Sequence, residues 1–331
     1  MKAFLKQSFP HEPGTFYRYS THCSHMLSAI ITKVSGLSLE QFLNRYLFYP
    51  MEIYEAQWEL SPEKLTAGGM GLSLYPMSLV KIAQLLLKEG SYNGSQLISK
   101  EYLKMAVTQQ IIKQYDINNP DSEFSGNGYG YQFHIGKDGY YRMDGAFGQL
   151  CLMCPDKKKA VIVFSQYSKT EALLSLIYKH LLNDTECCCA YIENTRPEKN
   201  AAAVDAVIPC SNFRLEDNIL GIKYVEFLPS CNEYLVKLCY AEYTETIRFS
   251  LLQETSGKMN FLKDLQVHKQ EYYCEAVFNE VLILKIYFIE TPYVAVYRFS
   301  FYGNKLRFEF SINVSFTLKD FAVDGFLVEE R

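Results

Sequence analysis

The side chains with the clearest potential for chemistry lie in the first half of the chain. Tyr19 stands in residues 12–21 (EPGTFYRYST), a turn-like segment that leads into a predicted helix. A phenol can carry a proton during acyl transfer, but its ordinary pKa of about 10 requires neighbouring cations that favour the phenolate. Ser78 and Lys81 form the pattern S-x-x-K, in which a lysine can activate a serine nucleophile. Taken without the motifs around it, Tyr19 is more simply a packed aromatic residue whose hydroxyl is hydrogen-bonded.

Cysteines and histidines offer weaker alternatives. Cys151 and Cys154 form C-x-x-C, but residues 149–155 read as a strand, in which residues three apart point to opposite faces. His22 and His25 share a face of the predicted helix, yet no third ligand is spaced to join them. The ten cysteines show no repeated spacing. We therefore expect reduced thiols, no metal ion and no organic cofactor.

Glycine-containing segments follow Tyr19 in a fixed order. They are residues 67–73 (AGGMGLS), 85–94 (LLLKEGSYNG), 129–133 (YGYQF) and 144–149 (DGAFGQ). In this order and with these gaps, the series resembles the penicillin-recognising serine hydrolases. That family includes class C-type β-lactamases, D-amino-acid peptidases, and related esterases and amide hydrolases. The resemblance covers residues 12–165, which is roughly the first half of the chain.

The resemblance implies ester or amide hydrolysis through an acyl-enzyme. In the family, a serine in S-x-x-K attacks the carbonyl, and the lysine and a tyrosine manage the proton. Tyr19 matches that tyrosine, with Thr21 where asparagine is usual. Asp144 and Gly145 match the third motif, usually K-T-G or H-x-G, without its cation, and the N–H of Ala146 would complete the oxyanion hole. The missing cation weakens the case for recognition of a β-lactam carboxylate, and Gly145 and Gln149 are more similar to the esterase and amidase branch.

The nucleophile is missing from its expected place. In the family S-x-x-K lies upstream of the tyrosine motif, and residues 1–18 hold no such pattern. The pattern at Ser78 follows the glycine segment, where the family has a surface helix, so we interpret Ser78 as part of the opening turn and Lys81 as solvated. We therefore expect residues 1–331 to be inactive, either because the gene start lies further upstream or because the chain is a remnant. The alternative is a non-catalytic binding protein derived from that fold.

The elements that position these residues follow from hydrophobic periodicity. The pattern predicts helices over residues 22–34, 39–48, 77–88, 99–109 and 171–182, with Gly36 ending the first and Ser38 and Ser99 as N-caps. Short strands are predicted over residues 130–135, 140–143, 150–154 and 160–165, separated by turn signals as antiparallel hairpins require. This part is predicted as a mixed α/β (α+β) fold, a partial β-lactamase-like domain whose antiparallel sheet is flanked by helices.

The pattern then changes to strands alone. Residues 194–205 are polar, contain Pro197 and read as a linker. Residues 305–316 alternate between apolar and polar, and Gly303-Asn304 joins them to residues 294–302 in a hairpin. Further strands over residues 234–252 and 281–290 bring the expected number to six to eight, which favours an all-β barrel-like domain. We assign residues 1–190 to the β-lactamase-related domain, N-terminally incomplete, residues 191–205 to the linker and residues 206–331 to the barrel.

Composition limits the partners. The chain has 33 Lys and Arg against 37 Asp and Glu, a net charge of −4, so it lacks the basic excess of a nucleic-acid binder. The best apolar run, residues 281–289, is interrupted by Lys285 and is too short to cross a membrane. Residues 3–5 are too short for a signal-peptide core. We expect a cytoplasmic protein with a small-molecule or peptide-like ligand, no nucleic acid and no membrane. An apolar groove left open in the first domain would favour self-association.

Overall fold

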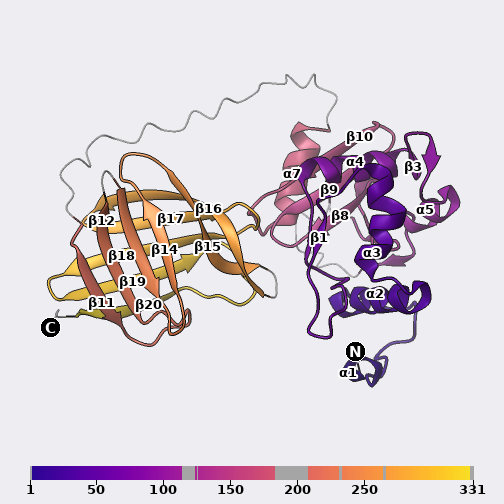
Figure 1. The fold of residues 1–331 in the computed structure, drawn as a ribbon. Helices are drawn as coiled ribbons and strands as arrows, with labels where there is room; N and C mark the ends of the chain where they lie inside the picture. Colours follow the sequence, from indigo (N-terminus) through magenta and orange to yellow (C-terminus); the bar gives the residue numbers. More distant parts are fainter. Residues whose placement is uncertain are drawn as a thin grey trace. The chain divides into compact units, whose positions relative to one another are not determined.

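The computed structural model describes residues 2–113, 124, 126–182, 208–230, 233–263 and 266–328 (Figure 1). The chain divides into two units, residues 1–187 and residues 188–331. The predicted boundaries at residues 190 and 206, and the linker between them, lie outside the described residues and stay predictions. In the part of the chain that is described, no helix is long and apolar enough to span a membrane.

A six-stranded antiparallel sheet forms the centre of the first unit, in the order β10-β9-β8-β7-β6-β5. Strands that follow one another in sequence are neighbours in space, as hairpin connections require. The strands are β5 (Ile111–Ile112), β6 (Gly128–Tyr129), β7 (His134–Ile135), β8 (Tyr141–Gly145), β9 (Gln149–Cys154) and β10 (Lys159–Val163). Two short ribbons accompany this sheet: β1 (Gln57–Trp58) with β2 (Leu72–Ser73), and β3 (Ser91–Tyr92) with β4 (Ser95–Gln96).

Helices cover both faces of this sheet, which confirms the predicted α+β architecture. On one face Cys154 packs with Leu174 of α7. On the other face Cys151 packs with Ala83 and Leu86 of α4. The two cysteines of C-x-x-C therefore lie on opposite faces, as the strand interpretation predicts. The helices are α1 (Lys2–Leu5), α2 (Thr21–Ser35), α3 (Leu39–Leu43), α4 (Pro76–Leu87), α5 (Lys100–Ala106) and α7 (Thr170–His180).

The predicted helix ends are largely confirmed. Gly36 closes α2 at a left-handed φ of 73°, and Ser38 and Ser99 cap α3 and α5 through their hydroxyls. The helix predicted over residues 39–48 is α-helical only to Leu43, and a π-helix (Asn44–Phe48) and a 3₁₀ turn (Tyr49–Met51) follow it. This 3₁₀ turn contains Pro50, which has no N–H to continue an α-helical ladder. The fourth helix ends at Ala106, before the predicted residue 109.

The strand predicted over residues 130–135 is wrong in its first part. The N–H of Gly130 donates to the carbonyl of Phe133 at 2.9 Å, and the N–H of Tyr131 donates to the carbonyl of Ala106 at 2.8 Å. Gln132 has a left-handed φ of 67°, which no strand residue adopts. Residues 130–133 therefore form the turn between β6 and β7.

The second unit is an antiparallel sheet that curls into a nearly closed barrel. Ten strands form it, more than the six to eight predicted, in the order β14-β13-β12-β11-β20-β19-β18-β17-β16-β15. Its two outer strands, β14 and β15, contact each other, which protects both edges. The strands are β11 (Ser211–Leu215), β12 (Tyr224–Ser230), β13 (Glu233–Cys239), β14 (Thr244–Phe249), β15 (Thr255–Lys263), β16 (Gln266–Asn279), β17 (Val281–Phe288), β18 (Val294–Tyr302), β19 (Lys305–Ile312) and β20 (Phe321–Leu327).

Aromatic rings fill the inside of this barrel. Phe299 stacks on Phe308 and meets Phe227 edge-on, each with ring centroids 5.1 Å apart. The alternation of residues 305–316 gives a strand only as far as Ile312. Asn313 leaves the ladder because its side-chain oxygen accepts the N–H of Val294.

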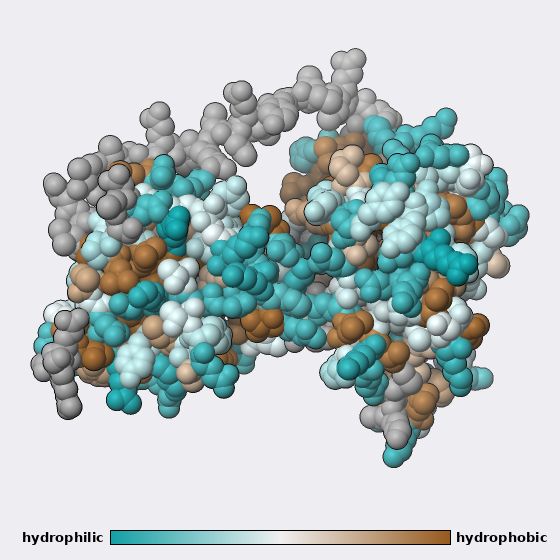
Figure 2. Space-filling model, viewed as in Figure 1, coloured by the Kyte–Doolittle hydropathy of each residue, from teal (hydrophilic) through white to brown (hydrophobic). Residues whose placement is uncertain are grey.

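The surface of both units is mixed in polarity. On the face drawn in Figure 2, hydrophilic and hydrophobic residues intermingle over each unit. In helix α2, Ser28 is the one buried residue of fifteen. Its apolar residues Leu27, Ile30 and Val34 are 50%, 52% and 81% exposed. The apolar stripe that predicts this helix is thus largely uncovered within the described part of the first unit.

Candidate active site

Tyr19 lies at the mouth of a small cavity beside the start of α2. Ser20 is the N-cap of that helix, and its hydroxyl accepts the N–H of Cys23 at 3.4 Å. The Tyr19 side chain is 58% exposed, and its hydroxyl has no hydrogen-bond partner among the described residues. The cavity holds about 80 Å³ and is lined by Tyr17, Arg18, Tyr19, Ser20, Cys23, Ser24, Tyr129 and Gln132.

The glycine segment after β1 fixes the start of α2. A side chain on Gly69 would place its Cβ 2.5 Å from Thr21, and one on Gly68 would lie 2.7 Å from Ser28. Only glycine lets the helix approach this closely. The Ser28 hydroxyl donates to the carbonyl of Thr66 at 2.7 Å, which ties the helix to the same segment. Thr21 therefore packs against this segment and is not among the residues that line the cavity.

The third motif occupies the turn from β8 to β9. Gly145 pairs with Gln149, whose side chain fills the space that a Cβ on Gly145 would need. Phe147 has a left-handed φ of 64°, and its carbonyl accepts the N–H of Tyr167 at 3.0 Å. Asp144 is half-buried, whereas Gly145 and Ala146 are exposed. The Tyr167 contact and the side chain of Gln149 thus hold the backbone of this turn, and Ala146 is an exposed residue within it.

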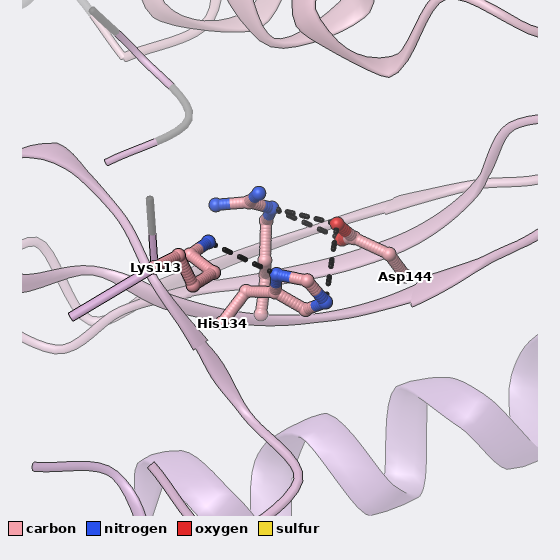
Figure 3. Close-up of polar contacts among 4 residues, drawn as sticks. Lys113, His134 and Asp144 are labelled. Carbon is pink, nitrogen blue, oxygen red and sulfur yellow. Dashed lines mark hydrogen bonds and ion pairs between the residues drawn. The ribbon is translucent and has the colours of Figure 1, made fainter. Parts of the chain in front are cut away.

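A polar cluster lies behind this turn (Figure 3). The Nζ of Lys113 is 3.2 Å from Nδ1 of His134, and the His134 Nε2 is 4.0 Å from a carboxylate oxygen of Asp144. The Nε of Arg142 donates to both oxygens of Asp144, at 3.0 and 3.1 Å. Strand register explains the grouping, because His134 pairs with Arg142 across β7 and β8. Lys113 and Arg142 are buried charged residues.

The cluster sets the protonation of its members. Burial first, and then the positive charges of Lys113 and Arg142, lower the pKa of His134 to about 3. The imidazole is therefore neutral at ordinary pH, and its Nδ1 accepts from Lys113. Burial raises the pKa of Asp144, while the charge of Arg142 and its hydrogen bond oppose that rise. The cluster holds two basic side chains, Lys113 and Arg142, and one carboxyl group, that of Asp144. It therefore favours a net positive charge near the turn between β8 and β9.

Tyr129 connects the cavity with this cluster. Its ring centroid lies 4.7 Å from that of Tyr17 and 5.1 Å, edge-on, from that of His134. Burial raises the pKa of Tyr129, and the nearby Tyr19 and Asp144 raise it further. Tyr129 therefore lies close to the residues of both motifs.

Sequence reasoning missed Lys113, His134, Arg142 and the role of Tyr129. The only signal was the presence of titratable residues in short apolar strands. The alternating pair Arg142 and Asp144 places both residues on one face of β8, but their partners come from β7 and from the residue after β5. That assembly depends on strand register, which no local pattern reports.

The pattern S-x-x-K at Ser78 has a structural role. Ser78 is 5% exposed, and its hydroxyl donates to the carboxylate of Glu55. Lys81 is half-buried and donates to the carbonyls of Met51 and Glu52 at 3.1 and 2.8 Å. The prediction that Lys81 is solvated is therefore wrong, because these carbonyls bind it. Neither residue lines the cavity that Tyr19 lines.

A second S-x-x-K, at Ser61 and Lys64, forms a tight turn. The N–H of Lys64 donates to the carbonyl of Ser61 at 2.8 Å, and Lys64 has a left-handed φ of 60°. A serine and a lysine at the two ends of such a turn do not share a helix face. We interpret this match as a turn sequence.

Six cysteines lie within the described residues. The cysteines of the described residues are free, and Cys151 and Cys154 are buried. Burial raises the pKa of both thiols to about 12, which keeps them protonated. Within the described residues, no group of three His, Cys, Asp or Glu side chains could hold a metal ion.

Comparison with known proteins assigns the first unit. The β-lactamase family model matches residues 1–182, which is more than half of the chain. The chain therefore belongs to the β-lactamase family of serine hydrolases. None of the curated proteins compared with the chain matches it.

Several solved structures are similar to this chain over part of their length. A candidate 6-aminohexanoate-dimer hydrolase from Bacillus anthracis is 20% identical with a TM-score of 0.43, over 53% of this chain and 46% of that one. A candidate β-lactamase from Bacteroides dorei is 12% identical with a TM-score of 0.44, over 54% and 62%. The octameric penicillin-binding protein homologue from Pyrococcus abyssi is 16% identical with a TM-score of 0.37, over 95% and 66%. The matched part spans between about half and two thirds of these proteins.

Proposed function

We propose that the first unit carries the proton-transfer side and the oxyanion side of a site for hydrolysis of small or peptide-like esters or amides. The observation that carries the proposal is the Tyr19 hydroxyl, which is exposed at a cavity and has no hydrogen-bond partner among the described residues. A hydroxyl without a packing role is available to a ligand. Tyr129, which lines the same cavity, lies close to Asp144 of the other motif.

The proposed roles follow from the chemistry of acyl transfer. Tyr19 would accept the proton of the attacking group and return it to the leaving group. The N–H of Ala146 would stabilise the oxyanion that develops on the carbonyl oxygen. Asp144 would position that turn, since Arg142 holds its carboxylate through two contacts. Gly145 would let the turn approach Gln149 closely.

We propose further that residues 1–331 alone form no acyl-enzyme. The support is that both S-x-x-K sequences have structural roles, one in a buried contact with Glu55 and one in a turn. The alternative is a binding protein that uses the same cavity without catalysis. A cytoplasmic location, supported by the free thiols of the described residues, and self-association, supported by the exposed face of α2, are proposals as well.

An added nucleophile tests the proposal. Hydroxylamine can replace the missing serine and attack p-nitrophenyl acetate bound in the cavity. We expect the chain to accelerate the release of p-nitrophenol in the presence of hydroxylamine and not in its absence. Tyr19→Phe should reduce this acceleration at least tenfold, because general base catalysis contributes about 10²–10⁴-fold. Tyr75→Phe is the matched control, because Tyr75 is 68% exposed and does not line the cavity. Equal acceleration by the chain and by Tyr19→Phe would contradict the role of Tyr19, and binding without acceleration would favour the binding protein.

A further inference from the structure

Gln132 has a backbone conformation that glutamine rarely adopts. Its φ of 67° lies in the left-handed region, within the turn from Gly130 to Phe133. Glycine takes this conformation without strain, whereas a residue with a Cβ is strained in it. The Gln132 side chain is exposed, so burial of the side chain does not explain why glutamine occupies this position. The position favours glycine, and the sequence has glutamine.

The side-chain oxygen of Gln132 already accepts a hydrogen bond within the protein. The Ser24 hydroxyl, on α2, donates to Gln132 Oε1 at 3.2 Å. These residues are 108 positions apart in the sequence, so the contact joins the turn to the helix that follows Tyr19. The amide Nε2, with two N–H groups, has no protein partner among the described residues. Gln132 and Ser24 both line the cavity that Tyr19 lines.

An amide held by its oxygen presents donors to a ligand. Neutral N–H donors suit a neutral acceptor such as the carbonyl oxygen of an amide or ester. A carboxylate would instead favour the guanidinium of Arg18, which lines the same cavity. The two kinds of ligand can therefore be separated by experiment.

On the basis of the proposed function, we infer that Gln132 is a specificity-determining residue that binds a carbonyl other than the one that reacts. The substrates are then acyl compounds with a second carbonyl, as in an N-acylamino acid derivative, and an ester with one carbonyl, such as p-nitrophenyl acetate, binds about fivefold more weakly. Ser24 is the residue that positions the Gln132 amide.

Equilibrium binding to the full chain tests this assignment. The probes are N-acetylglycine N-methylamide, with two carbonyls, and N-methylacetamide, with one, each titrated while the amide signals of Cys23 and Ser24 are followed by NMR. We expect the diamide to bind about fivefold more tightly, the value of one hydrogen bond of about 1 kcal/mol. Gln132→Glu keeps an acceptor for Ser24 and removes the donors, so it should abolish this preference.

Gln132→Gly separates a role in binding from a role in the turn. It should abolish the preference for the diamide, because it removes the side-chain amide. It should also raise the melting temperature, because glycine adopts the left-handed conformation without strain. Lys158→Gly is the matched control, since Lys158 is exposed at a φ of 50° in the turn between β9 and β10. That control should also raise the melting temperature and leave the preference unchanged.

Two outcomes would overturn the assignment. One is an unchanged preference for the diamide in Gln132→Glu and Gln132→Gly. The other is tighter binding of N-acetylglycine, which carries a carboxylate, in both the original chain and Gln132→Glu, since this would assign recognition to Arg18. Because these titrations need no turnover, failure of the hydroxylamine reaction would leave them intact, and their failure would leave the role of Tyr19 open to its own test.

Discussion

The ammonium nitrogen of Lys113 lies 3.2 Å from Nδ1 of His134, although 21 positions separate the two residues in the sequence. Since Lys113 is a donor only, the contact fixes the ring as the neutral tautomer with its proton on Nε2, the atom that faces Asp144. The third motif lacks a cation of its own. Arg142 supplies positive charge from the same strand, β8, and Lys113 supplies it from the residue after β5.

His134 should stay neutral well below its ordinary titration range, since its pKa is lowered to about 3. In the unfolded chain His134 takes a proton near pH 6.5, so folding stability falls as the pH decreases from about 6.5 towards 3, by about 4–5 kcal/mol over that window. The raised pKa of Asp144 acts in the opposite sense below its folded value. Imidazole nitrogen shifts in NMR measure the tautomer, and His134→Gln should flatten the pH dependence of urea unfolding. A doubly protonated ring at pH 5 would contradict this assignment.

Ser78 should contribute to stability and not to catalysis. Ser78→Ala removes a buried donor to Glu55, so the free energy of unfolding in urea should fall by about 1–3 kcal/mol. Ser95→Ala, at an exposed position of the same unit, should change it by less than about 0.5 kcal/mol. Intact-mass spectrometry after incubation with a fluorophosphonate or a penicillin should show no adduct. Stoichiometric labelling at Ser78 would refute the structural role.

Gly69 should be intolerant of a side chain. Gly69→Ala would bring a methyl group 2.5 Å from both the Cγ2 and the carbonyl oxygen of Thr21. We expect a loss of about 1–3 kcal/mol in the free energy of unfolding, together with shifted NMR signals of Tyr19, because the start of α2 must move. Thr21→Ser in the same chain removes one of the two contacts and should restore part of the loss. An unchanged unfolding midpoint in Gly69→Ala would show that the helix does not pack here.

The exposed face of α2 should govern self-association. Leu27, Ile30 and Val34 are each at least half exposed and lie at helical spacing. If this face associates, light scattering should give a mass above that of one 38.2 kDa chain at micromolar concentration. Replacing Leu27 and Ile30 with glutamine should return the mass to that of one chain. A single-chain mass before the replacement would contradict self-association.

The sequence predicts those structural features well that are determined by residues close together in the chain. Gly36 and the capping serines Ser38 and Ser99 act within one helical turn, so the helix ends could be predicted. The opposite faces of Cys151 and Cys154 follow from the strand period alone. Tyr19 could be proposed as a site residue because its motif is contiguous.

What could not be predicted depends on contacts between distant segments. Residues 130–133 alternate aromatic side chains, Tyr131 and Phe133, with other residues, a pattern typical of a strand. The contact of Tyr131 with Ala106 and the left-handed φ of Gln132 nevertheless make them a turn. The cluster of Lys113, His134 and Asp144 arises only when three strands take their register. The number of barrel strands was underestimated because long segments such as residues 234–252 contain two strands and a turn.

Under the proposed function, Tyr19 and Ala146 act on the same carbonyl group of the substrate. Hydrogen bonds of about 2.6–3.2 Å on each side of a tetrahedral carbon require the Tyr19 hydroxyl and the Ala146 nitrogen to lie within roughly 10 Å. The most direct measurement is one NMR titration with N-acetylglycine N-methylamide that follows the Tyr19 ring and the Ala146 amide together. We expect both signals to shift with the same dissociation constant, and Tyr19→Phe to alter the shift at Ala146. A response at Tyr19 with a silent Ala146 amide, or two different constants, would contradict a shared site.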